Sequence, residues 1–205
     1  MRVSFVTTNP VKIASIKRVL EARGIQVDIV DQDIPEIQAA TAAEVAEAKA
    51  RQAYQILGRP LLVNDFAFHI DALNGWPGAF VKMETERLGL DVFFRMLKTE
   101  QGHLGYACRM VNAVAYVDAF LRTPKVFTRE IPGIISPDVY EAMPEKRGAW
   151  VDKVFVPDGE TLSLGQMTKP QFEAWRRRGA VEGYYRELAD WLLAHDAATD
   201  KIASR

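Results

Sequence analysis

The stretch RVSFVTTNPVKIASIKRVLEARG, residues 2–24, decides the first unit of the fold, because its hydrophobic periodicity changes partway along. Residues 2–6 alternate and are rich in β-branched side chains, which is typical of a strand. Beyond the polar TTNP segment the apolar residues recur at helical spacing, with Asn9 as an N-cap and Pro10 at the first helical position. We therefore predict a strand, a polar loop and a helix that ends near Gly24.

The rest of the chain continues to mix strand and helix signals. We expect a strand over 26–30, then a helix from the capping box Thr41-x-x-Glu44 to Gly58, then a strand from 60 that ends at Asn64-Asp65 and resumes over 66–73. A helix over 89–97 and a hairpin over 106–128 that turns near Asp118 follow. After an irregular stretch over 132–147 we expect a short strand over 154–156 and a C-terminal helix from 181 that frays from Ala197. This alternation predicts an α/β fold.

Composition limits the class of protein. The 205 residues are 48% hydrophobic and no linker divides them, so we expect a single domain over residues 1–205. Lys and Arg together number 26 against 27 acidic residues, a balance that argues against binding a nucleic acid polymer. No apolar run is long enough to span a membrane. The lone Cys108 cannot form an intrachain disulfide, which favours a reducing, cytoplasmic location.

The loop before the first helix is a candidate anion site. Thr7, Thr8 and Asn9 precede a helix whose first turn carries Lys12. Free N–H groups and the positive end of a helix dipole favour phosphate, and Lys12 adds a point charge. The motif lacks a Gly-rich phosphate-binding pattern, so an ordinary strand-to-helix turn with a surface lysine is the alternative.

Acidic residues at two expected strand ends form a second candidate site. One group lies in the loop from Asp31 to Glu36, and the other is Asn64-Asp65. Oxygen ligands of this kind suit Mg²⁺, which keeps several waters and uses substrate phosphates to complete its coordination. Solvated loop carboxylates are the alternative. The turn-rich segment Asn74-Gly75-Trp76-Pro77-Gly78 adds a rigid loop a short distance further on.

Taken in order, these segments resemble a known family. The segments FVTTN at 5–9, LVND at 62–65 and DALNGWPG at 71–78, together with lysines at positions 12 and 82, are similar to those of inosine triphosphate pyrophosphatases. The resemblance implies an elongated mixed twisted sheet with flanking helices, two lobes around a nucleotide cleft and a homodimer. It also implies Mg²⁺-dependent hydrolysis of a non-standard nucleoside triphosphate to the monophosphate and pyrophosphate.

The resemblance assigns roles to individual residues. It implies that Asp65 and Lys12 are catalytic and that Glu36, Asn64 and Asp65 bind the metal. Thr8 replaces a glycine of the family's phosphate loop, and Asn64 replaces a carboxylate. The residues implied to bind substrate are Thr7, Thr8, Asn9, Lys12, Lys82, Trp150, Asp152, Lys169, Arg177 and Arg178.

The C-terminal half departs more from the family. The base-pocket segment is echoed at 148–155, where Asp152 aligns and Trp150 stands one place early. The family's Ser-His-Arg signature falls on residues 176–178 and keeps only Arg178, and Lys169 lies near the place of an upstream lysine. Two alternatives follow from these departures: activity on a different nucleotide in a specialised pathway, or a catalytically silent nucleotide-binding protein.

Overall fold

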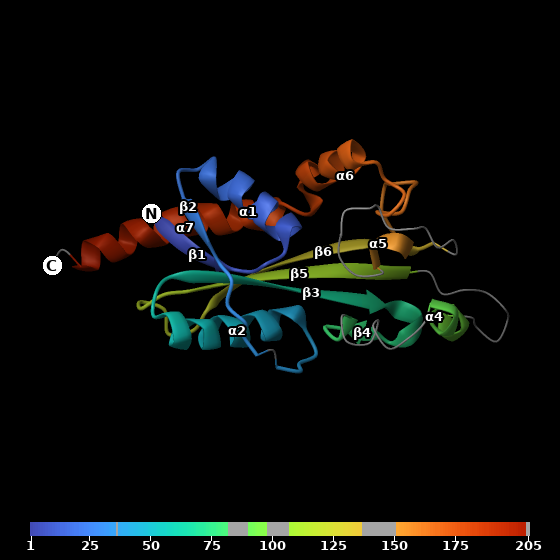
Figure 1. Cartoon of the computed structure of the whole chain (residues 1–205), viewed down its shortest axis with the longest axis horizontal. Helices are drawn as coiled ribbons and strands as arrows, with labels where there is room; N and C mark the ends of the chain where they lie inside the picture. Colours follow the sequence, from blue (N-terminus) through green and yellow to red (C-terminus); the bar gives the residue numbers. More distant parts are fainter. Residues whose placement is uncertain (36, 82–89, 98–106, 137–150, 204–205) are drawn as a thin grey trace.

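The computed structural model describes residues 1–35, 37–81, 90–97, 107–136 and 151–203, and its centre is one mixed β-sheet (Figure 1). In spatial order the strands are β2 (Gln26–Val30), β1 (Arg2–Val6), β3 (Leu61–Ile70), β5 (Ala107–Val117), β6 (Lys125–Ile135) and β7 (Phe155–Pro157), with β4 (Pro77–Gly78) paired to β3. The first three of these strands are parallel, and the remaining pairs are antiparallel. The predicted mixed α/β architecture is confirmed.

Helices flank the sheet on both faces. In chain order they are α1 (Pro10–Glu21), α2 (Ala42–Leu57), the 3-10 turn η1 (Asp71–Leu73), α4 (Leu90–Leu97), α5 (Val151–Val154), α6 (Lys169–Trp175), the π-type turn η2 (Arg176–Ala180) and α7 (Gly183–Ala203). Figure 1 shows α1 and α7 on one side of the sheet and α2 on the other. Among the described residues, no helix combines the length and apolar character that a membrane crossing requires.

Local sequence signals set the bounds of α1 and α2. The Asn9 side chain accepts hydrogen bonds from two N–H groups in the first turn of α1, as expected of an N-cap. Thr41 and Glu44 form the reciprocal capping box that the sequence predicts for α2. Gly58 ends α2 in the left-handed conformation, with φ 60°, which costs a residue without a side chain little.

Apolar cores lie on both faces of the sheet. On one face, α1 and α7 pack on β1 and on even-numbered positions of β3 and β5 such as Leu62 and Val114. On the other face, α2 packs on the odd-numbered positions such as Val63 and Ala113. The fully buried side chains of α2 in this core are alanines (Ala42, Ala46, Ala50 and Ala53), and Tyr54 and Leu57 pack against it partly buried. Small side chains let the helix approach the strands closely.

Three predicted boundaries are wrong. β3 does not end at Asn64-Asp65 but continues to Ile70, because it pairs with β5 at every position from Leu61 to Ile70. β6 extends through the start of the stretch expected to be irregular as far as Ile135, paired with β5 and then β7. α7 stays helical through Ala203, although the sequence predicts fraying from Ala197. In all three cases long-range pairing or helix continuation outweighs a local signal.

Candidate active site

A cavity of about 1090 Å³ opens between the first turn of α1, the middle of β3 and the start of α7. Further walls come from the loop after β2 and from the segment that joins α6 to α7. A volume of this size is sufficient for a nucleotide, since pockets for drug-sized ligands span ~300–1,000 Å³. The polar side chains of its lining are Thr7, Thr8, Asn9, Lys12, Asp31, Gln32, Asp33, Lys49, Asn64, Asp65, Asn112, Asp152, Arg176, Tyr184 and Tyr185.

The cavity passes an open edge of β3. Among the described strands, β1 pairs with β3 as far as Leu62, and β4 pairs with the same edge only from Phe68. Asn64 and Asp65 lie in the interval between these two pairings and face Val114 and Ala113 of β5 across the other edge. The polar pair therefore lies in the middle of a strand at a point where one side of the sheet is open.

Asn64 and Asp65 reach the cavity from opposite faces of the sheet. Successive side chains of a strand point in opposite directions. Asn64 shares a face with Leu62, in the core under α7, and Asp65 shares a face with Val63, in the core under α2. The cavity lining includes Lys49 of α2 as well as residues of α7, so both layers contribute to it.

The start of α1 forms another wall of the cavity. Asn9 Oδ1 accepts hydrogen bonds from the N–H groups of Val11 at 2.9 Å and Lys12 at 3.2 Å. Thr7 Oγ1 accepts from the Asn9 N–H at 3.2 Å. The cap thus uses donors that a bound phosphate could otherwise take, which leaves the Lys12 ammonium and the helix dipole as the main attraction for an anion. Thr8, which the family resemblance places at a glycine position, is exposed.

The Asn64 side chain is hydrogen bonded to a residue of α7. Its Nδ2 donates a 3.0 Å hydrogen bond to the hydroxyl of Tyr184, and both side chains are buried. Its Oδ1 is also buried and has no hydrogen-bond partner among the described residues. An unsatisfied buried oxygen costs about 1–3 kcal/mol, so a ligand that offers positive charge is stabilised there.

Burial raises the pKa of Tyr184 well above its ordinary value, and burial raises that of Tyr185 to about 12. The two rings stack with centroids 4.2 Å apart. Both phenols therefore remain protonated at physiological pH and act as hydrogen-bonding groups rather than as bases.

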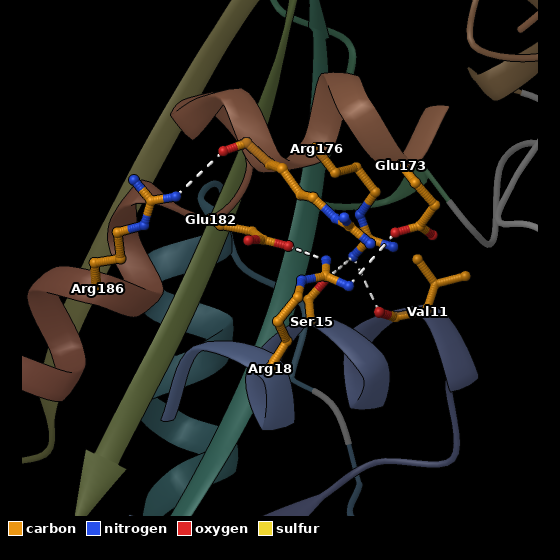
Figure 2. A network of polar contacts seen from close by, with 8 residues as sticks. Val11, Ser15, Arg18, Glu173, Arg176, Glu182 and Arg186 are labelled. Atoms are coloured by element: carbon orange, nitrogen blue, oxygen red, sulfur yellow. Dashed lines mark hydrogen bonds and ion pairs between the residues drawn. The ribbon is translucent and has the colours of Figure 1, made fainter. Parts of the chain in front are cut away.

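Arg176 ties this part of the site to α1 (Figure 2). Its Nη2 donates to the carbonyl of Val11 at 3.0 Å and to Ser15 Oγ, and its guanidinium lies 5.5 Å from the Phe172 ring centroid. Only 4% of Arg176 is exposed, and desolvation by burial lowers its pKa from the ordinary value. A buried arginine therefore joins the segment after α6 to the first turns of α1.

A second arginine supports the same junction from α1 (Figure 2). Arg18 pairs with the buried Glu182, and its Nη1 lies 3.4 Å from Glu173 Oε2. The hydrogen bond to Glu182 raises the pKa of Arg18 above its ordinary value despite partial burial. Arg186 donates to the carbonyl of Arg177 at 3.2 Å and closes the turn from the other side.

The structure brings part of the predicted set together. The predicted residues that line the cavity are Thr7, Thr8, Asn9, Lys12, Asn64, Asp65 and Asp152. Lys169, Arg177 and Arg178 are not part of that lining, and Arg178 instead pairs with Glu160 at 2.6 Å on the surface. The predictions for Glu36, Lys82 and Trp150 lie outside the described residues.

Sequence reasoning misses several residues of the site. The sequence groups Arg176 with its two neighbours as a basic turn, yet it is the one of the three that lines the cavity. Tyr184 and Tyr185 belong to the apolar stripe of the last helix, which predicts only a core role for them. A buried partner for Asn64 leaves no local signal, because Tyr184 lies 120 residues away.

The donor set can be compared with the needs of Mg²⁺, which the family resemblance implies. Oxygen donors suit this ion, and Asn64 Oδ1 is a buried oxygen left over by the protein. No three His, Cys, Asp or Glu side chains gather closely enough to enclose a metal within the described ranges. Asn64 and Asp65 offer oxygen donors of the kind that suit Mg²⁺, an ion that keeps several waters and uses substrate phosphates to complete its coordination.

The fold and the cavity define an α/β protein with a large polar cavity at an open edge of its sheet. Comparison with known families narrows this class. The family model described as "Ham1 family" matches residues 3–182, and the chain belongs to the Ham1 family.

Similar proteins cover nearly the whole chain. A "dITP/XTP pyrophosphatase" of Thermococcus kodakarensis is 30% identical over 94% of this chain and 97% of that protein. One of the same description from Methanopyrus kandleri is 32% identical over 82% and 85%, respectively. Among solved structures, a HAM1 protein from Coxiella burnetii has a TM-score of 0.74 at 20% identity, covering 95% of this chain and 99% of that one. The fold resemblance therefore extends beyond the N-terminal segments that carry the sequence motifs.

Proposed function

We propose that this chain hydrolyses a non-standard nucleoside triphosphate to the nucleoside monophosphate and pyrophosphate. Its relatives include proteins described as dITP/XTP pyrophosphatases and as inosine triphosphate pyrophosphatase, which favours a deaminated purine as the base. The observation that carries the proposal is the placement of Asp65 and Asn64 at the open edge of β3, facing one cavity with Lys12 of α1.

The phosphate end of the substrate fits the α1 side of the cavity. Lys12 and the α1 dipole neutralise charge on the leaving pyrophosphate, the charge that builds up as the bond to the α-phosphorus breaks. Asp65, which lies on the face of β3 that α2 covers, orients the attacking water or accepts its proton. Thr7, Thr8 and Asn9 shape the loop around the phosphates.

Mg²⁺ is the cofactor that we propose, with Asn64, Asp65 and Glu36 as its protein ligands. When bound, the ion supplies positive charge to the phosphate oxygens. A carboxylate bound to a metal is a weak general base, so Asp65 performs one of the two tasks rather than both.

We assign the base end of the substrate to the part of the cavity that α6 lines. Phe172 and Trp175 line the cavity there and offer flat apolar surfaces, which suit a purine ring. Asp152 lies in the same lining and supplies an acceptor for a base N–H. Roles for Trp150, Lys82, Lys169, Arg177 and Arg178 in substrate binding stay predictions from the family resemblance.

Two further properties belong to this proposal. We propose that the protein is a homodimer, as the family resemblance implies, and light scattering at several concentrations tests this. We propose a cytoplasmic location, which the lone and buried Cys108 favours because no intrachain disulfide is possible. Fractionation of cells that produce the protein tests the location.

The decisive experiment measures product identity. The purified chain is incubated with dITP, XTP, ITP and the standard triphosphates, with and without Mg²⁺, and pyrophosphate and orthophosphate are quantified separately. We expect pyrophosphate with a deaminated purine and no release after chelation of the metal. Orthophosphate as the first product would refute the proposal, and nucleotide binding without turnover would favour the silent nucleotide-binding alternative.

A further inference from the structure

The contact between Asn64 and Tyr184 fixes more than the position of a side chain. The Asn64 amide has one donor end and one acceptor end of nearly equal size, so two orientations fit the same space. In the observed orientation Nδ2 donates to the Tyr184 hydroxyl at 3.0 Å, and Oδ1 is the atom without a partner among the described residues. In this orientation the hydroxyl pairs with the donor end of the amide, and Oδ1 is the atom left for a ligand.

The Tyr184 hydroxyl is itself held by its surroundings. Tyr184 is 2% exposed, and its ring stacks on that of Tyr185 at 4.2 Å. Burial raises the pKa of the Tyr184 hydroxyl well above its ordinary value, so the phenol stays neutral. Its oxygen accepts the hydrogen bond from Asn64 Nδ2 at 3.0 Å.

A buried arginine, Arg176, acts on both tyrosines and contacts α1. The positive charge of Arg176 acts on both tyrosines and lowers their pKa values against the effect of burial. Arg176 in turn donates to the Val11 carbonyl and to Ser15. Arg176 thus acts electrostatically on the two tyrosines and is hydrogen bonded to the helix that carries Lys12.

We propose that Tyr184 is a positioning residue that keeps Oδ1 of Asn64, and not Nδ2, available to a divalent cation beside Asp65. This inference rests on the proposed function for the presence of the cation. It explains how an amide serves where relatives are expected to have a carboxylate. A carboxylate has two equivalent oxygens and needs no such orientation, whereas a reversed amide presents N–H groups that repel a cation.

The difference between amide and carboxylate supplies the test. Tyr184→Phe is made both in the natural protein and in the Asn64→Asp variant, and the affinity of each nucleotide-free protein for Mn²⁺ is measured by electron paramagnetic resonance. With Asn64 present, we expect Tyr184→Phe to weaken Mn²⁺ binding about tenfold, the effect of one well-placed polar contact. In the Asn64→Asp background, we expect a change of less than about twofold, because orientation no longer matters.

Tyr116→Phe is the matched control. Tyr116 is buried in the same apolar core as Tyr184 and also loses one side-chain hydrogen bond, to Asp118, but it does not line the cavity. We expect unchanged Mn²⁺ affinity in this variant. Urea unfolding of every variant separates a loss of folded protein from a loss of binding.

Several outcomes would overturn the inference. Equal weakening of Mn²⁺ binding by Tyr184→Phe in both backgrounds would mean that the phenol acts through packing alone. No weakening with Asn64 present would mean that the hydroxyl does not orient the amide. Absence of Mn²⁺ binding in the natural protein would also overturn the inference, while pyrophosphate release in the product assay would still support the proposed function.

Discussion

Two buried polar clusters each include one residue of α7, and they differ in how completely their polar atoms are hydrogen bonded. At the end away from the cavity, Asp118 Oδ2 accepts from Tyr116 at 3.0 Å and lies 2.7 Å from His195 Nε2. Its Oδ1 accepts from the N–H groups of Phe120 and Leu121 at 2.9 and 3.0 Å. Both carboxylate oxygens therefore have two partners each, and the hairpin turn is fixed to the last helix.

At the cavity end the pairing is incomplete. Asn64 lines the cavity, and its Oδ1 is buried without a hydrogen-bond partner among the described residues. A buried polar atom without a hydrogen-bond partner lowers the stability of the fold. Such an atom is retained in a native protein when its residue has a function, for example ligand binding. The fully paired cluster at Asp118 thus stabilises the fold, whereas the unpaired oxygen of Asn64 lies where we propose that a ligand binds.

The largest effect that we expect is on turnover, from Asp65→Asn. Loss of the charge that serves the transition state should raise its free energy by about 3 kcal/mol or more, which is a fall in turnover of more than about a hundredfold. The urea midpoint should change little, because the side chain lies at a cavity and not in the apolar core. Pyrophosphate release above about a tenth of the natural rate, only ~1.4 kcal/mol, would contradict this role.

The second effect is on stability, from Asp118→Ala. This change leaves the buried Tyr116 hydroxyl and two partly buried N–H groups without their acceptor, and we expect the free energy of unfolding to fall by about 2–3 kcal/mol. Turnover of the protein that remains folded should be unchanged, since Asp118 does not line the large cavity. A variant with normal stability, or with slow turnover when fully folded, would break the contrast between the two clusters.

A smaller effect is expected from Lys12→Ala. Removing one cation from the phosphate end of the cavity should reduce turnover about tenfold, or ~1.4 kcal/mol, while alanine preserves the helix. Lys17→Ala is the control, because Lys17 lies on the same helix and pairs with Glu21 at 3.9 Å instead of lining the cavity. Equal kinetics for the two variants would place Lys12 with the ordinary surface lysines.

The smallest effect is expected from Arg178→Ala. The pair with Glu160 is exposed on the arginine side, so its loss should cost less than about 1 kcal/mol of stability. We expect the KM for the nucleotide to change less than about twofold. A large rise in KM without loss of kcat would instead support the base-binding role that the family resemblance implies for this residue.

Local signals in the sequence are sufficient for the first half of the fold. The Asn9 cap, the box formed by Thr41 and Glu44, and the terminator Gly58 act on neighbouring backbone atoms, so their effects can be read from residue order. The same holds for Lys12, whose place at the cavity follows from its position in the first turn of α1.

Features that depend on distant contacts cannot be read in this way. Asn64-Asp65 looks like the end of a strand, but pairing with β5 carries the strand through it. Arg176 looks like one of three solvated arginines, and its burial follows from Val11 and Ser15, which lie more than 160 residues away in sequence. Only the folded chain shows that the Arg176 guanidinium supports the structure of the site.

The open edge of β3 also has a consequence for how a ligand would affect the dynamics of the two layers. Because Lys49 of α2 and Tyr184 of α7 both line the cavity, a molecule that contacts both cannot stay fully bound when either helix separates from the sheet. Ligand at about a hundred times its Kd would add about 2.7 kcal/mol to the stability of every layer whose opening releases it. Amide hydrogen exchange in α2 and α7 should therefore slow together on binding, although the two helices pack on different faces.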